Sequence, residues 1–395
     1  MKVAIIVGNN VWFCPYIKIY TTVFEKNGID YDIISWNRDA IEEDAIQFTC
    51  ALKHKNPLAK FWASLRYSSF VKDTLSRNDY DGVVIFSIAT AIFLNRFLSG
   101  SYGKRYIFDY RDLSIEQKAI FKKPFQRVLK NSFANVVSSP GFIKYLPKGF
   151  DYILSHNFDI NLVRKALDCG EQTLGTQKGI DVLTIGGIRD YESNSQVIDA
   201  LANKDGFTVR FVGKGPSAEV LKQHAEEMQA KNVYFEGYYP KEKEKDYING
   251  CAFLNIFYPR RPSHDTAISN RFYNSLIYHK PMITTADTVQ GDYAAKYGVG
   301  LSLENCENLD VKLKEYLQSD EYKDFSENAH DLLYQFVQDY EKWESVVNKF
   351  AVHSVYLIDK QIDNGGGYEL GLIFGRILCD NSCKAFSYNG WGLAA

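Results

Sequence analysis

The sequence predicts an α/β protein built from two doubly wound halves that face a central cleft. Short β-rich apolar runs alternate with helix-compatible segments, which is typical of parallel βαβ units. This alternation restarts after a polar connector at about 159–178. The length of 395 residues is sufficient for two domains with full cores.

In the first half, apolar runs of strand length alternate with polar or helical segments. Tyr16–Asn27 fits a helix that Gly28 ends. The expected strands are 2–7, 31–35, 82–87, 105–108, 135–138 and 152–154.

The second half repeats this architecture without repeating the sequence. Its expected strands are 181–185, 208–212, 233–235, 251–257, 282–285 and 299–303, and a long charged helix is expected over 320–350. We therefore expect a first domain at 1–158, a connector at 159–178, a second domain at 179–350 and a tail of unclear role at 351–395. Ligands of such sheets bind at the carboxyl ends of the strands, so we expect the functional residues in the loops there.

The composition is that of a globular protein, with 46% apolar and 24% charged residues. The net charge of −2 gives no reason to expect a nucleic-acid partner. Residues 1–155 hold 21 Lys and Arg against 14 Asp and Glu, whereas the rest holds 25 against 34, which suggests different partners for the two halves. Seven scattered cysteines predict reduced thiols in a cytoplasmic protein, and the five-residue apolar run 3–7 does not predict a signal peptide.

The stretch 251–285 reads as strand, polar loop, helix and short strand. Its loop carries four charged or titratable residues, and Thr266–His279 has helical apolar spacing with three polar residues on the other face. A cationic loop at the start of a helix suits an anionic phosphate. The alternative is an ordinary αβ connection with a solvated loop. The residues concerned are Arg260, Arg261, His264 and Asp265 in the loop, and Asn270, Arg271 and Asn274 on the helix.

A second candidate is the loop after the expected strand 105–108. Asp109, Arg111 and Asp112 place acids beside a guanidinium, which can orient a substrate hydroxyl or accept its proton. The alternative is a structural Asp–Arg pair that braces the loop.

Glycine-rich loops follow two successive strands of the second half. Gly186 and Gly187 allow backbone amides to approach a phosphate that Arg189 can neutralise, and Lys214 lies in a similar loop. Each loop alone also fits an ordinary tight turn. Polar residues near the expected cleft in the first half are Asn9, Asn10, Arg111, His156 and Asn157, although a lone histidine such as His156 is more often structural than a ligand.

Two segments, 53–72 and 118–130, combine basic with large apolar residues. This combination suits an anionic bilayer surface. The alternative is a pair of ordinary amphipathic surface helices.

Several ordered pieces resemble the GT-B glycosyltransferases of the family-4-like group found in bacterial polysaccharide clusters. The resemblance covers roughly residues 1–345. It is carried by 15–18, 32–38, 108–113, 138–142 and His156-Asn157 in the first half, and by 184–187, 210–216, 234–237 and Asn270-Arg271 through Lys280-Pro281 in the second.

The resemblance implies two Rossmann-like domains, an acceptor domain first and a nucleotide-sugar donor domain second. Gly187 and Arg189 would lie near the diphosphate, which Arg271 would neutralise without a metal ion or other cofactor, and Asp112 would position the acceptor hydroxyl. It implies a sugar transfer, typically with retention, to a saccharide acceptor in surface or capsular polysaccharide synthesis. The acceptor is expected to be lipid-linked, and the basic segments 53–72 and 118–130 place the reaction at the inner membrane face. The donor contacts expected on this basis are Gly186, Gly187, Arg189, Lys214, Asn270, Arg271 and Asn274.

The chain departs from that family at two positions. Thr266 and Asn274 stand where many members carry two glutamates with seven residues between them. Asp265 could replace the first carboxylate as a catalytic group, and Asn274 could still bond a ribose hydroxyl. This departure keeps two alternatives open: a nucleotide-sugar 2-epimerase, and a degenerate partner subunit that binds a sugar nucleotide or an active transferase.

Overall fold

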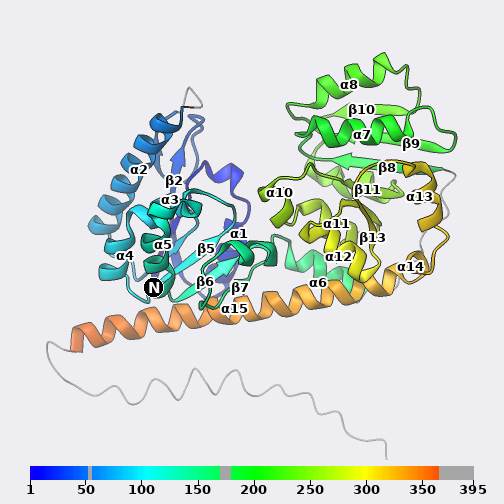
Figure 1. Cartoon of the computed structure of the whole chain (residues 1–395). Coiled ribbons are helices and arrows are strands. Elements are labelled where there is room, and N and C mark those ends of the chain that lie inside the picture. Colours follow the sequence, from blue (N-terminus) through cyan, green and yellow to red (C-terminus); the bar gives the residue numbers. More distant parts are fainter. Residues whose placement is uncertain (52–55, 170–178, 364–395) are drawn as a thin grey trace, which may run out of the picture.

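A computed structural model describes residues 1–51, 56–169 and 179–363. Two parallel sheets form the centres of two α/β domains that lie side by side (Figure 1). The first sheet has the order β3-β2-β1-β4-β5-β6-β7. Its strands are β1 Lys2–Ile6, β2 Asp30–Asn37, β3 Ile46–Thr49, β4 Gly82–Ile85, β5 Tyr106–Tyr110, β6 Ala134–Val137 and β7 Ile153–Leu154.

The second sheet has the order β10-β9-β8-β11-β12-β13, which reverses between β8 and β11. This reversal creates a crevice outside the carboxyl ends of those two strands. The strands are β8 Ile180–Ile185, β9 Phe207–Val212, β10 Val233–Gly237, β11 Phe253–Ile256, β12 Met282–Thr285 and β13 Gly300–Leu303.

Helices cover both faces of each sheet, as the βαβ pattern requires. In the first domain they are α1 Ile17–Lys26, α2 Pro57–Arg77, α3 Ile88–Phe93, α4 Asn95–Ser101 and α5 Ala119–Asn131, with short 3-10 turns η1 Val11–Phe13, η2 Ile115–Gln117 and η3 Pro140–Tyr145. The rest are α6 Ile160–Asp168, α7 Tyr191–Leu201, α8 Ala218–Glu227, η4 Lys241–Lys243, α9 Glu244–Asn249, α10 Pro262–Thr266, α11 Asn270–Ile277, α12 Val289–Tyr297, α13 Leu309–Tyr316, α14 Asp320–Lys323 and α15 Phe325–Asp363.

Strand periodicity divides the core of the first domain between the two faces of its sheet. On β1, Val3 and Ile5 pack with α1 and α15, whereas Ala4 and Ile6 pack with α2 to α5 on the opposite face. Successive side chains of a strand point to opposite faces, so an all-apolar strand must be covered on both sides.

The long helix α15 joins the two domains and runs beneath both of them (Figure 1). It packs against α1 and β7 of the first domain and against α6 and α11. Trp343 is fully buried, and its Nε1 donates to the Tyr20 hydroxyl at 3.2 Å. The helix continues to Asp363 without a break at the boundary expected after residue 350, and residues 364–395 of the expected tail lie outside the described part. Within the described residues, no helix is long and apolar enough to cross a membrane.

Two elements differ from the sequence-based expectation. Strand β3 was not predicted. The loop expected before residue 266 contains a short helix, α10, and the helix expected over 266–279 begins only at Asn270, because extended backbone at Ala267 and Ser269 separates α10 from α11. The Gln290 side chain explains the interruption, because its Oε1 accepts from both the amide (2.9 Å) and the hydroxyl (2.8 Å) of Ser269.

The two domains also touch through η3 and α10. A Cβ built at Gly141 of η3 would lie 2.7 Å from the Thr266 carbonyl oxygen and 2.3 Å from Cγ2 of Val289. Only glycine allows this approach, so Gly141 sets the separation of the domains at this contact.

Candidate functional site

A cavity of about 490 Å³ lies at the carboxyl ends of β8 and β11, where the strand order of the second sheet reverses. The topology of an open α/β sheet favours ligand binding at this point. Six of the seven expected donor contacts line the cavity: Gly186, Gly187, Arg189, Asn270, Arg271 and Asn274. Further lining residues include Tyr239, Lys241, Glu244, Tyr258, His264 and Gln290.

Arg271 is fixed by backbone carbonyls at the ends of two strands. Its Nε donates to the Ile185 oxygen at 2.5 Å, and its terminal nitrogens donate to the oxygens of Asn255 (3.3 Å) and Gly187 (2.9 Å). No described carboxylate forms an ion pair with it. The guanidinium is therefore preorganised and keeps its positive charge for a ligand.

The start of α11 lies in the same cavity as this guanidinium. A helix N-terminus carries partial positive charge and unpaired amide donors. The combination of the helix terminus and Arg271 can hold an anion such as a diphosphate.

The glycines after β8 and β9 allow two loops to pack against each other. A Cβ built at Gly213 would lie 2.0 Å from the Gly186 oxygen, and one at Gly215 would lie 2.1 Å from the Ile188 oxygen. Lys214 does not line the cavity, and its Nζ lies 5.7 Å from the centre of the Tyr238 ring. The second glycine loop therefore shapes the site by packing, whereas Gly187 and Arg189 lie in the cavity wall.

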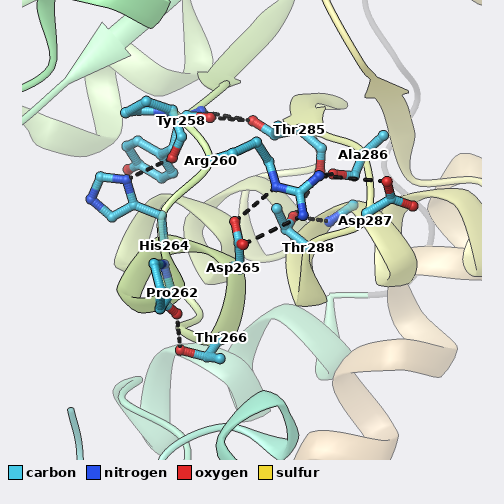
Figure 2. Close-up of polar contacts among 12 residues, drawn as sticks. Tyr258, Arg260, Pro262, His264, Asp265, Thr266, Thr285, Ala286, Asp287 and Thr288 are labelled. Atoms are coloured by element: carbon cyan, nitrogen blue, oxygen red, sulfur yellow. Dashed lines mark hydrogen bonds and ion pairs between the residues drawn. The ribbon is translucent and has the colours of Figure 1, made fainter. Parts of the chain in front are cut away.

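The loop after β11 directs two neighbouring side chains differently (Figure 2). The Asp265 carboxylate faces Arg260, with Nε to Oδ1 at 2.9 Å, and does not line the cavity. His264 does line the cavity, and its Nδ1 donates to the Pro259 carbonyl at 3.0 Å, because a carbonyl can only accept. A catalytic role for Asp265 thus remains a prediction without direct geometric support.

Thr266 does not reach the cavity in place of a carboxylate. It is fully buried in α10, and its hydroxyl donates to the Pro262 oxygen at 2.7 Å (Figure 2).

In the first domain, Asp109 and Arg111 form an ion pair at the end of β5. This is the structural Asp–Arg pair that the sequence analysis gave as the alternative to a catalytic role. Arg111 donates to Asp109 through Nε (2.8 Å) and a terminal nitrogen (2.9 Å), and also to the Ser155 hydroxyl at 3.1 Å. Tyr20 donates its hydroxyl to the same carboxylate at 2.9 Å. All of these groups are buried or nearly so, and none of them lines the cavity.

Asp112 differs from its neighbours because its side chain is exposed. Desolvation by the surrounding protein raises its pKa above the ordinary value, although the Leu113 amide, which donates to it at 2.8 Å, favours the charged form. His264 of the second domain also favours the charged form of Asp112 electrostatically.

His156 and Asn157 connect the two domains. The His156 ring bonds the Tyr273 hydroxyl (3.0 Å) and Asp339 of α15 (3.3 Å), and desolvation lowers its pKa despite the carboxylate. Asn157 donates to Asn270 Oδ1 at 3.0 Å, which ties the first domain to the start of α11.

Asn9 and Asn10, which follow β1, form hydrogen bonds with the backbone of nearby loops. Asn10 is fully buried, and its Oδ1 accepts from the amide of Arg38 at 2.9 Å, while its own backbone amide donates to Asn9 Oδ1 at 3.0 Å.

Sequence reasoning missed Lys241 and Glu244, which follow β10. Both line the cavity at the carboxyl ends of β8 and β11, which we call the main cavity. They also line an adjoining cavity of about 340 Å³ between α1, α6, α11 and α15. They sit in the segment Lys241–Lys245, whose alternating charges are typical of a solvated surface. In the described residues, no group of three or more His, Cys, Asp and Glu is arranged to hold a metal ion.

Comparison with family models gave no match, and comparison with curated proteins found no similar sequence. Solved structures do match across most of the chain. Sucrose-phosphate synthase from Thermosynechococcus elongatus aligns with a TM-score of 0.63 at 14% identity, over 91% of this chain and 100% of that one. Anabaena Alr3699/HepE, solved with UDP and glucose, aligns with a TM-score of 0.60 at 14% identity, over 88% and 100%.

Two further structures extend this comparison. WaaG, a glycosyltransferase involved in lipopolysaccharide biosynthesis, aligns with a TM-score of 0.58 at 13% identity, over 87% and 99%. A Listeria monocytogenes protein assigned as a UDP-N-acetylglucosamine 2-epimerase aligns less well, with a TM-score of 0.50 at 9% identity, over 82% and 90%. Together with the two doubly wound sheets, these alignments define a two-domain α/β protein. Its fold is GT-B, as the sequence resemblance implied.

Proposed function

We propose that the protein is a glycosyltransferase that moves a sugar from a nucleoside diphosphate donor to a saccharide acceptor. The observation that carries the proposal is the Arg271 guanidinium. Three backbone carbonyls hold it at the strand-order reversal beside the start of α11, and no described carboxylate neutralises it. The likeness to a protein solved with UDP and glucose supports the same donor class.

The reaction breaks the bond between the anomeric carbon and the diphosphate oxygen, and negative charge develops on that oxygen. In this proposal Arg271 and the N-terminus of α11, which line the same cavity, would stabilise this charge without a metal ion, because preorganised donors stabilise developing charge most effectively. Asp112 would orient the acceptor hydroxyl and accept its proton as the hydroxyl oxygen forms the new bond to the anomeric carbon. Retention of configuration, and a lipid-linked acceptor of surface polysaccharide synthesis, belong to the same proposal.

Thermal-shift screening tests the donor class. UDP, GDP and their sugars should raise the melting temperature, because a ligand that binds only the native state stabilises it by mass action. The donor identified in this way is then incubated with saccharide acceptors, and transfer is followed by mass spectrometry. Failure of every nucleotide to shift the melting temperature would overturn the proposal.

A 2-epimerase is the second candidate, because one structural neighbour is assigned that activity. An epimerase converts the sugar of its donor with no acceptor present, so donor alone, followed by product analysis, separates the two enzymes. Binding without turnover of any donor or acceptor would instead favour a non-catalytic partner subunit, which the neutral Thr266 and Asn274 would suit.

We also propose that the first domain binds an anionic membrane surface, on the inner face of the membrane. The described part of the first expected segment, 56–72, and the second segment, 118–130, contain eight Lys and Arg and no acid. Leu58, Trp62 and Ile120 are exposed beside these charges. Aromatic contacts from Phe61 to Phe93 (5.7 Å) and from Phe93 to Phe121 (6.1 Å) join α2, α3 and α5 into one surface. Lys53 and Lys55 of the expected segment lie outside the described residues.

Vesicle binding tests the membrane proposal. Lys118, Lys122 and Lys123 are exposed, whereas Arg127 already donates to Asn95, so neutralising the three lysines changes charge without breaking a described contact. Each charge near an anionic surface contributes about 1 kcal/mol, so the triple glutamine variant should bind anionic vesicles at least tenfold more weakly. Neutral vesicles are the control, and equal binding by both proteins would overturn the proposal.

A further inference from the structure

The carboxylate of Glu244 lies at the junction of the two cavities. It comes from the first residue of α9, and its side chain is only 14% exposed. Three side chains donate to it: Tyr239 to Oε1 at 3.0 Å, and Lys241 and Asn274 (3.4 Å) to Oε2. Glu244 is therefore held in one orientation against α11.

This arrangement leaves unused acceptor capacity on two residues that line the cavity. A carboxylate has about four lone-pair directions, and only one described donor uses Oε1 of Glu244. Asn274 donates through Nδ2, and no described donor occupies its Oδ1. The pair can thus accept two hydrogen bonds from one ligand.

The position of this pair relative to Arg271 defines which part of a ligand would reach it. Asn274 follows Arg271 by three residues in α11, so both lie on the same face, about 4.5 Å apart along the helix axis. Both line the main cavity. Arg271 and Glu244 are also close enough for both to act electrostatically on Tyr239. In a nucleoside diphosphate, the ribose adjoins the phosphates at a comparable separation.

We propose that Glu244, oriented by Asn274, binds the ribose hydroxyls of the nucleoside diphosphate. The inference rests on the proposed donor class and adds the residue that recognises its sugar ring. A vicinal diol supplies two O–H donors, which matches the two open acceptors, and a carboxylate accepts such bonds more strongly than a neutral group. The acid missing from α11 at position 274 is thereby supplied by α9.

Discrimination between ribose and deoxyribose tests this role directly. Calorimetry compares UDP with 2′-deoxy-UDP, and GDP with 2′-deoxy-GDP. Loss of one hydrogen bond to a charged group weakens binding about tenfold or more, so the wild type should prefer a ribonucleotide by at least that factor. E244Q should reduce this preference to about twofold or less.

Two further variants separate recognition from structure. Glu242 is exposed, precedes Glu244 by two residues and lines neither cavity, so E242Q removes the same charge and should keep the wild-type preference. The double variant E244Q/N274E returns a carboxylate to the site from α11 and should restore the preference at least in part. If Glu244 had only a structural role, E244Q would lower the melting temperature, or would lower the affinities for the ribonucleotide and the deoxyribonucleotide equally. The ratio of the two affinities would then not change.

The outcomes distinguish this inference from the proposed function. If the wild type binds a nucleotide but E244Q keeps the full ribose preference, or the wild type has none, the inference is wrong and the donor class stands. If neither UDP nor GDP binds the wild type, the proposed function fails and the inference fails with it.

Discussion

Replacing Gly141 with alanine should weaken the contact between the two domains. The added Cβ would lie 2.3 Å from Val289 Cγ2, 2.7 Å from the Thr266 oxygen and 2.8 Å from the Thr266 Cα. Carbon atoms in contact need about 3.5–4.0 Å, so η3 and α10 must separate by about 1 Å. Overpacking costs about 1–3 kcal/mol, and the lower entropy of the unfolded alanine chain offsets about 0.4–1 kcal/mol. The expected net loss is about 1–2 kcal/mol.

Urea denaturation measures this loss as a lower transition midpoint. Gly100 provides the matched control, because it lies within α4 and a Cβ there would meet nothing within 4 Å. G100A should be neutral or more stable by up to about 1 kcal/mol. Small-angle scattering would detect whether G141A also separates the domains. Wild-type stability together with an unchanged radius of gyration for G141A would refute the reasoning.

Three further variants test the buried contacts. D109N leaves the Arg111 guanidinium buried without its counter-ion and should cost about 3–5 kcal/mol by urea denaturation, so a loss under 1 kcal/mol would contradict the bracing role. W343A removes a fully buried side chain from α15 and should also cost about 3–5 kcal/mol. Burial lowers the pKa of His156, so the wild type should lose stability as the pH falls below about 6.5, where the unfolded state binds the extra proton. The melting temperature of H156Q should depend less on pH between 7 and 5, even though Asp339 loses its partner. The same change of melting temperature with pH in H156Q and the wild type would contradict this.

The sequence predicted most strands because parallel strands buried on both faces appear as continuous apolar runs. Strand β3 escaped prediction because it lies at the edge of its sheet and contains the polar Gln47 and exposed Thr49. The break between α10 and α11 also escaped, because it depends on Gln290, a residue distant in sequence whose side chain bonds Ser269. Such a contact carries no local periodic signal.

The site shows the same limit. Arg271 and the glycines after β8 were found because their loops follow strands that end at one edge of the sheet. The roles of the residues in the loop after β11 could not be assigned from the sequence, because several charged residues there can pair in more than one way. In the structure, Asp265 pairs with Arg260, and His264 lines the cavity. Glu244 was hidden because only tertiary packing brings it to Asn274.

The central claim is that Arg271 binds the diphosphate of the donor. Calorimetry of UDP and GDP with the wild type and R271A tests it most directly. Arg77 is the matched control, because it is an exposed arginine at the end of α2 that does not line the cavity. We predict that R271A loses about 10- to 100-fold in affinity, as expected for one or two charge-assisted hydrogen bonds, and that R77A keeps the wild-type affinity. Equal nucleotide affinity for R271A and the wild type would contradict the account.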